Sequence, residues 1–104
     1  MFNFFKKVDS ISAKEFIALK DKEAVLDVRE VGEPAKDEKS LFKNYTLLPM
    51  SRLKQDYSKL DKNTTYYILC RTGARAVSAS KFLENQGYQT VVISGGIMAI
   101  KNLI

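Results

Sequence analysis

Short apolar runs separated by polar turns divide this chain into alternating strand-like and helix-like segments. The most informative run covers residues 66–69, where four consecutive bulky residues are typical of a strand covered on both faces. Apolar residues then recur at helical spacing from about residue 74, and Gly87 stands where a helix usually ends. The pattern therefore predicts a buried strand, a short loop that begins at Cys70, and a helix.

The same alternation continues on both sides of this unit. Strands are predicted at residues 24–28, 46–48 and 90–93, and Pro49 ends the second of them. Short helices are predicted after a capping box between Ser12 and Glu15, over residues 52–60 with Ser51 as the cap, and from residue 97 after a Gly-Gly turn. Residues 31–45 are the least regular part, and we predict a loop there with at most a turn or two of helix. The charged run at 36–39 is expected to be solvated.

The repeated strand–helix order predicts a single α/β domain over residues 1–104, with a mainly parallel sheet and helices on both faces. Residues 1–7, MFNFFKK, are expected to form a loose N-terminal extension. This start is too short to span a bilayer and lacks the apolar core of a signal peptide. No stable membrane insertion is therefore expected.

The counts of cysteine and histidine exclude more classes of catalytic site than the net charge does. The net charge is +5, but the lysines are scattered, so binding of nucleic acid is not expected. The chain has one cysteine and no histidine, which excludes a zinc site of the usual kind, histidine acid–base catalysis and an internal disulfide. No metal or cofactor is expected. A lone thiol that must stay reduced favours a cytoplasmic location.

Cys70 is the candidate nucleophile because of where the pattern places it. It lies at the carboxyl edge of a strand, where open α/β sheets bind ligands, and at the amino end of a helix. Free backbone N–H groups and the helix dipole favour an anion there, and Gly73 lets the backbone turn with positive φ. Arg71 and Arg75 add positive charge. Together these features favour the thiolate over the thiol.

Four segments resemble the rhodanese-type sulfurtransferases. The sequence CRTGAR at 70–75 is similar to the Cys-Arg-x-Gly-x-Arg active-site loop of that family. Residues 25–30, 48–53 and 92–97 resemble its Asp-Val-Arg strand end, its Ile-Pro-Leu-Ser-x-Leu segment and its closing strand with a Gly-Gly turn. The chain departs from the family at 40–45, which does not match Gly-His-Ile-Pro-Gly-Ala, and it has no Trp. Because of this departure, the resemblance does not predict the shape of the loop at 31–45.

The resemblance implies a sulfurtransferase that moves a sulfane sulfur through a persulfide on Cys70. The donor would be thiosulfate or a small-molecule or protein persulfide, and the acceptor a thiol or cyanide. Thr72, Gly73 and Ala74 would contribute mainly backbone N–H groups. Arg75 would either anchor the loop or meet the anionic end of the donor. Arg71 is expected to be exposed, either for donor binding or as surface charge only.

Asp27 and Arg29 are candidate neighbours of the pocket. They lie at the carboxyl edge if the strand at 24–28 runs parallel to the strand at 66–69. The alternative, which we favour, is that they form structural ion pairs and caps that hold loops together.

Two other functions remain open from sequence. Tyrosine phosphatases also close a cysteine loop with arginine, but with five intervening residues where this chain has four. A persulfide carrier, a redox sensor or a partner-docking module would need the same cysteine. Loop length disfavours the phosphatase, whereas the sequence separates a carrier from an enzyme poorly, because both need the same cysteine.

Overall fold

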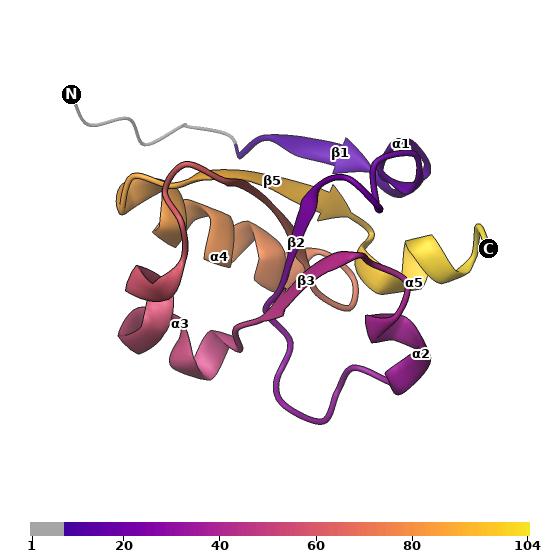
Figure 1. The fold of residues 1–104 in the computed structure, drawn as a ribbon, viewed down its shortest axis with the longest axis horizontal. Coiled ribbons are helices and arrows are strands. Elements are labelled where there is room, and N and C mark those ends of the chain that lie inside the picture. Colours follow the sequence, from indigo (N-terminus) through magenta and orange to yellow (C-terminus); the bar gives the residue numbers. More distant parts are fainter. Residues whose placement is uncertain (1–7) are drawn as a thin grey trace.

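A computed structural model describes residues 8–104 and contains one sheet of five parallel strands, in the order β1-β5-β4-β2-β3 (Figure 1). The strands are β1 (Ser10–Ser12), β2 (Ala24–Asp27), β3 (Asn44–Leu47), β4 (Thr65–Leu69) and β5 (Gln89–Ser94). The predicted α/β fold with a parallel sheet is confirmed. The predicted N-terminal extension lies outside the described residues.

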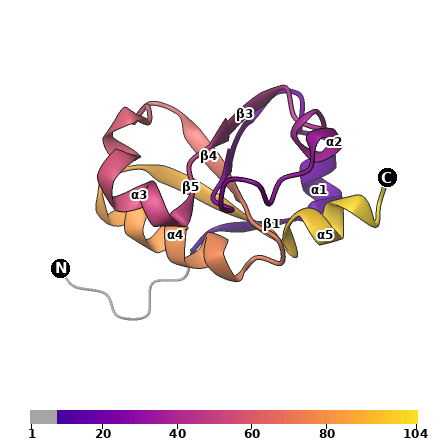
Figure 2. The ribbon, with the colours of Figure 1, turned by 90° about the horizontal axis from the view of Figure 1, so that it is seen from below.

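Helices cover both faces of this sheet (Figures 1 and 2). They are α1 (Ala13–Ile17), α2 (Lys36–Lys39), α3 (Met50–Asp56) with a 3-10 turn at Tyr57–Lys59, α4 (Ala74–Asn85) and α5 (Gly96–Lys101). No helix among residues 8–104 is long and apolar enough to cross a bilayer.

The alternation of side chains along β2 shows how the two faces are filled. Leu26 belongs to a core cluster with residues of α3 and α4, such as Leu53 and Leu83. Its neighbour Val25 belongs to the opposite cluster, with residues of α1 and α5 such as Phe16. Successive residues of a strand point to opposite faces, so a strand covered on both sides reads as a continuous apolar run.

The register of β2 and β4 positions the candidate site. Asp27 is aligned with Leu69, and the N–H of Val28 donates to the carbonyl of Leu69 at 2.9 Å. Both strands therefore end at the same edge of the sheet, where Cys70 and Arg29 follow them.

Three local predictions differ from the structure. The strand β1 was not predicted, because its three residues carry little pattern and are held by pairing with β5. The helix predicted at 52–60 begins at Met50 after Pro49. Ser51 does not cap it, because the Ser51 N–H and hydroxyl both donate to the Glu30 carboxylate, at 3.1 and 2.5 Å.

The capping box at the start of α1 forms only in part. Ser12 Oγ accepts the backbone N–H of Glu15 at 3.1 Å, as predicted. The Glu15 carboxylate accepts the hydroxyl of Ser12, at 2.9 Å, where a full capping box would use the backbone N–H of Ser12.

Candidate active site

The sulfur of Cys70 is enclosed by the start of α4. Cys70 follows β4 directly and is 1% exposed. Its Sγ accepts the backbone N–H of Gly73 at 3.0 Å and that of Ala76 at 3.4 Å. Gly73 precedes the helix with φ of 112°, a conformation that a residue with a side chain rarely adopts and that lets the chain turn into α4. Such N–H groups stabilise a negative charge on sulfur.

The N–H donors differ in part from the set that the sequence suggested. Gly73 is one of them, whereas Thr72 and Ala74 are exposed and make no described hydrogen bond to the sulfur. Ala76 was missed. Its place in the first turn of the helix, where backbone N–H groups lack helical partners, is the signal that could have identified it.

Helix α5 holds the cysteine loop from the other side. The backbone N–H of Ile97 donates to the carbonyl of Cys70 at 2.9 Å, and that of Met98 donates to the carbonyl of Arg71 at 3.2 Å. This approach requires a glycine at position 96, because a Cβ there would overlap with both carbonyl groups. The loop is therefore fixed between the starts of two helices.

The two arginines of the loop have different surroundings. The Arg75 guanidinium binds both carboxylate oxygens of Glu33, at 2.7 and 2.8 Å, and so anchors the loop to residues 30–34. This contact lowers the pKa of Glu33 to about 2 and raises the pKa of Arg75. Arg71 is exposed and has no ion pair among the described residues.

Of the two predicted pocket neighbours, Arg29 lines the pocket described below and Asp27 does not, and both belong to a buried charge network. Asp27 is 0% and Arg29 3% exposed, and they form an ion pair at 2.8 Å. Arg29 also pairs with Glu38 at 2.7 Å, and the hydroxyl of Tyr45 donates to Asp27 at 2.6 Å. Burial alone would lower the pKa of Arg29, but hydrogen bonds to the two carboxylates raise it above its ordinary value. Burial and the bond to Asp27 raise the pKa of Tyr45.

Glu38 corrects the prediction that the charged run at 36–39 is solvated. Its side chain is buried and pairs with Arg29 and, at 2.9 Å, with Lys101 at the end of α5. Burial would raise the pKa of Glu38, but these bonds and the N–H of Ala35 lower it to about 2. The run forms α2, so the prediction of a short helical turn in this region holds.

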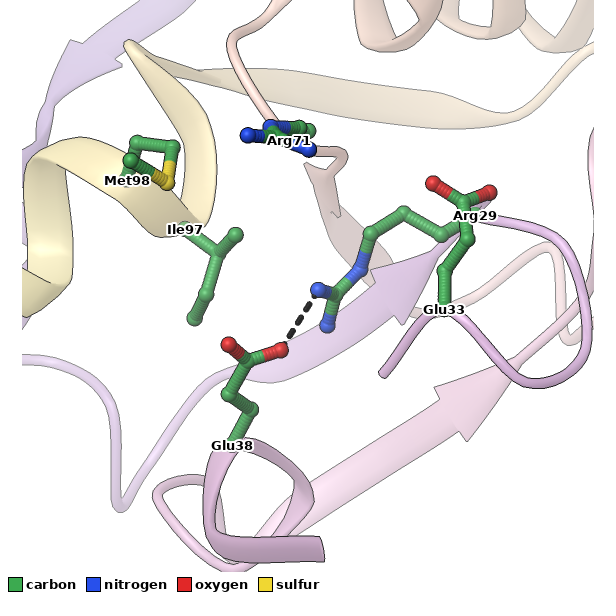
Figure 3. A pocket seen from close by; sticks show the side chains of 6 residues that line it. All are labelled: Arg29, Glu33, Glu38, Arg71, Ile97 and Met98. Atoms are coloured by element: carbon green, nitrogen blue, oxygen red, sulfur yellow. Dashed lines mark hydrogen bonds and ion pairs between the residues drawn. The ribbon is translucent and has the colours of Figure 1, made fainter. Parts of the chain in front are cut away.

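A pocket of about 350 Å³ lies beside the cysteine loop, between that loop, α2, α5 and the segment after β2 (Figure 3). It is lined by Arg29, Glu33, Glu38, Arg71, Ile97 and Met98. Figure 3 shows Arg71 and Met98 on one side of the pocket and Glu38 on the other, with Arg29 directed at Glu38. Of these six residues, the sequence suggested only Arg29 and Arg71. Within residues 8–104, no group of three His, Cys, Asp or Glu side chains could hold a metal ion.

Comparisons with known proteins identify the family and support the fold. The family model of the rhodanese-like domain matches residues 12–103. YtwF of Bacillus subtilis, whose name assigns it provisionally to the sulfurtransferases, is 31% identical over 94 residues, which are 90% of this chain and 88% of YtwF. A sulfurtransferase of Allochromatium vinosum is 31% identical over 94 residues, 89% of this chain and 85% of the relative. The crystal structure of a rhodanese-related protein from Thermoplasma volcanium has a TM-score of 0.78 at 26% identity, and the match covers 91% of this chain and 92% of that one.

Proposed function

This chain belongs to the rhodanese-like family, and we propose that it is a sulfurtransferase that carries a sulfane sulfur as a persulfide on Cys70. The observation that carries the proposal is the pair of backbone N–H groups, from Gly73 and Ala76, directed at the Cys70 sulfur. They stabilise the thiolate before transfer and an anionic persulfide after it. No general base is needed, which suits a chain without histidine.

The proposed reaction has two displacements at sulfur. The Cys70 thiolate attacks the outer sulfur of thiosulfate, the new S–S bond forms at Sγ, and the broken S–S bond leaves its electron pair on sulfite. In the second step a thiolate or cyanide attacks the outer sulfur of the persulfide. The S–S bond of the persulfide breaks, and its electron pair returns to Sγ of Cys70. Each step conserves charge and needs no outside oxidant.

The loop favours sulfur over phosphorus as the transferred atom. Only four residues lie between Cys70 and Arg75, and Arg75 is already bound to Glu33 on both of its terminal nitrogens. A phosphoryl group brings three outer oxygens that all need donors, whereas a persulfide brings one further sulfur. The short loop, and an Arg75 that is already bound to Glu33, therefore favour the transfer of sulfur over the transfer of a phosphoryl group.

The direct test is mass spectrometry of the purified chain after incubation with thiosulfate. One added sulfur atom on Cys70 is expected, with none on Cys70→Ser. Repeated formation of thiocyanate when cyanide is added would identify an enzyme, whereas a single transfer per chain would identify a carrier. Cys70-dependent hydrolysis of an aryl phosphate, with no persulfide formed, would refute the proposal.

A further inference from the structure

The edge strand β3 carries backbone groups that the sheet leaves unpaired. β3 pairs only with β2, and Figure 2 shows it along one border of the ribbon. The N–H of Leu48 donates to the carbonyl of Asp27 at 2.9 Å, so this N–H faces β2. Backbone groups alternate sides along a strand, and those of Tyr45 and Leu47 therefore point away from β2. Within residues 8–104, no loop or side chain bonds to these backbone groups, so they are open to a further strand.

A groove of about 360 Å³ lies beside this edge, between β3 and α3. Its apolar lining comes from three separate segments of the chain and includes Val31, Leu47, Leu48, Pro49 and Leu60. Val31 is 80% exposed, more than the other large apolar residues of the described chain. A side chain that enters the groove from a strand paired with β3 would cover Val31, and removing this apolar surface from water favours binding.

The charge beside the groove is positive. Arg52 pairs with Asp56 at 3.2 Å, and Lys59 lies 3.8 Å from the same carboxylate, so two cations share one anion. The side chains of Arg52 and Lys59 are 59% and 79% exposed. The whole chain carries a net charge of +5, so a second copy would bring like charge to this edge. The charges therefore match an acidic partner better than a second copy of the chain.

We propose that β3 is a docking edge for an extended, acidic segment of a partner protein, which adds to the sheet as a sixth strand. Main-chain hydrogen bonds to the outward N–H and C=O groups of Tyr45 and Leu47 hold this segment. One apolar side chain of the segment enters the groove, and its acidic residues lie near Arg52 and Lys59. The backbone bonds supply affinity, and the groove and the charges supply specificity.

The docking edge adjoins the end of the sheet that holds Cys70. Val31 comes after β2, Pro49 follows β3 and Cys70 follows β4, and these three strands are parallel. Their carboxyl ends therefore meet at one edge of the sheet, and a partner bound along β3 extends toward that edge. The binding itself uses no part of the cysteine loop, so the inference does not depend on the proposed sulfur transfer.

A short peptide with blocked ends, in which valine and glutamate alternate, is the probe for this edge. Its matched control carries lysine in place of each glutamate. We would titrate both into the isotope-labelled full chain and follow the backbone amides by NMR. The acidic peptide should slow hydrogen exchange of the Tyr45 and Leu47 amides about fivefold or more, and it should bind about tenfold more tightly than the lysine peptide. No binding at millimolar peptide, no protection of these two amides, or equal binding of the two peptides would overturn the proposal.

Two substitutions separate the backbone contribution from that of charge. Leu47→Pro removes an N–H that faces away from β2, so the ladder to β2 stays intact and the acidic peptide should bind about tenfold more weakly. Lys59→Glu leaves the backbone unchanged and should weaken the acidic peptide about fivefold while strengthening the lysine peptide. Lys81→Glu is the matched control, because Lys81 is exposed on α4 and does not line the groove. Equal losses in Lys59→Glu and Lys81→Glu would refute the role of the local charge.

Sedimentation of the full chain tests the other occupant of this edge. The chain should remain a monomer at the concentrations used for the titration, because two copies repel each other at β3. A concentration-dependent dimer that Leu47→Pro abolishes would show that a second copy pairs with β3. That result would overturn the assignment of this edge to an acidic partner.

Discussion

Two charged regions border the same pocket, and they differ in how their charges are satisfied. In the network of Asp27, Arg29 and Glu38, which is buried, and Lys101, which is exposed, every charge faces an opposite one, and Asp27 and Arg29 are almost wholly removed from water. In the cysteine loop, Arg71 is exposed and has no such partner among the described residues. A buried charge that is already paired is not available to bind a charged ligand, whereas an exposed charge without a pair is available. The network should therefore govern stability, and the loop should govern chemistry.

The largest effect should follow from breaking the network. Asp27→Asn would leave the Arg29 guanidinium buried with only part of its compensation, and we expect a loss of about 3–5 kcal/mol in the free energy of unfolding. Urea denaturation measures this change. Glu33→Gln, at a half-exposed pair with Arg75, is the control and should cost less than about 1 kcal/mol. Similar losses in the two variants would contradict the distinction between a buried network and a surface pair.

A smaller effect, in both stability and chemistry, should follow from Gly96→Ala. The new methyl group would collide with the carbonyls of Cys70 and Arg71, and φ of 60° disfavours any side chain. Overpacking and left-handed strain together should cost about 2–4 kcal/mol. Persulfide formation should also fall, because the loop must move.

Gly87→Ala is the matched control for that prediction. Its φ is 93°, but the nearest contact is the flexible end of Lys62 at 3.4 Å. The Gly87→Ala variant should lose only about 1–2 kcal/mol of the free energy of unfolding, from the strain of a side chain at positive φ, and should form the persulfide as the wild type does. If both glycine variants retain normal sulfur loading, Gly96 does not position the loop.

Acid should weaken the network in a defined range of pH. Glu38 has a pKa of about 2 in the folded chain, below its ordinary value of 4.5, so its ionised form stabilises the fold. That contribution is complete above pH 4.5 and is lost as the pH falls toward 2, by an amount on the order of 2–3 kcal/mol. Unfolding free energies measured between pH 5 and pH 2 should show a steeper decline for the wild type than for Glu38→Gln. Parallel declines would show that Glu38 does not carry the effect.

The smallest effect on stability should come from substitution of Arg71, the exposed arginine of the cysteine loop. Arg71→Met should change the free energy of unfolding by less than about 0.5 kcal/mol, because its charge has no ion pair within residues 8–104 to lose. It should nevertheless lower kcat/KM for anionic donors about tenfold, mainly through KM. Arg75→Met should lower the free energy of unfolding by up to about 1 kcal/mol, because it breaks the half-exposed pair with Glu33, and should raise KM less than Arg71→Met does. A larger rise in KM for Arg75→Met than for Arg71→Met would assign donor binding to the wrong arginine.

Local pattern was enough to predict the centre of this fold. The apolar run of β4, the helical spacing of α4 and the glycine before it placed Cys70 between a strand end and a helix start. These features depend on residues that are neighbours in the sequence, whose preferences act within a few positions. The parallel sheet followed from the repeated strand–helix order, because parallel strands need a crossover connection.

Tertiary structure alone decided the surroundings of the cysteine. Glu38 bonds with Lys101, 63 residues away, and Glu33 with Arg75, 42 residues away, and both pairings depend on how separate elements dock. A charged residue in a polar run carries no local sign that it will be buried, since burial is determined by the opposite charges that packing brings to it. The sequence alone determined that Cys70 stands at the sheet edge, between a strand end and a helix start. The packing of the loop at residues 30–34 against α4 decided that Arg75, and not Arg71, has an ion pair among residues 8–104, because ion pairs form between side chains that only the folded chain brings within reach.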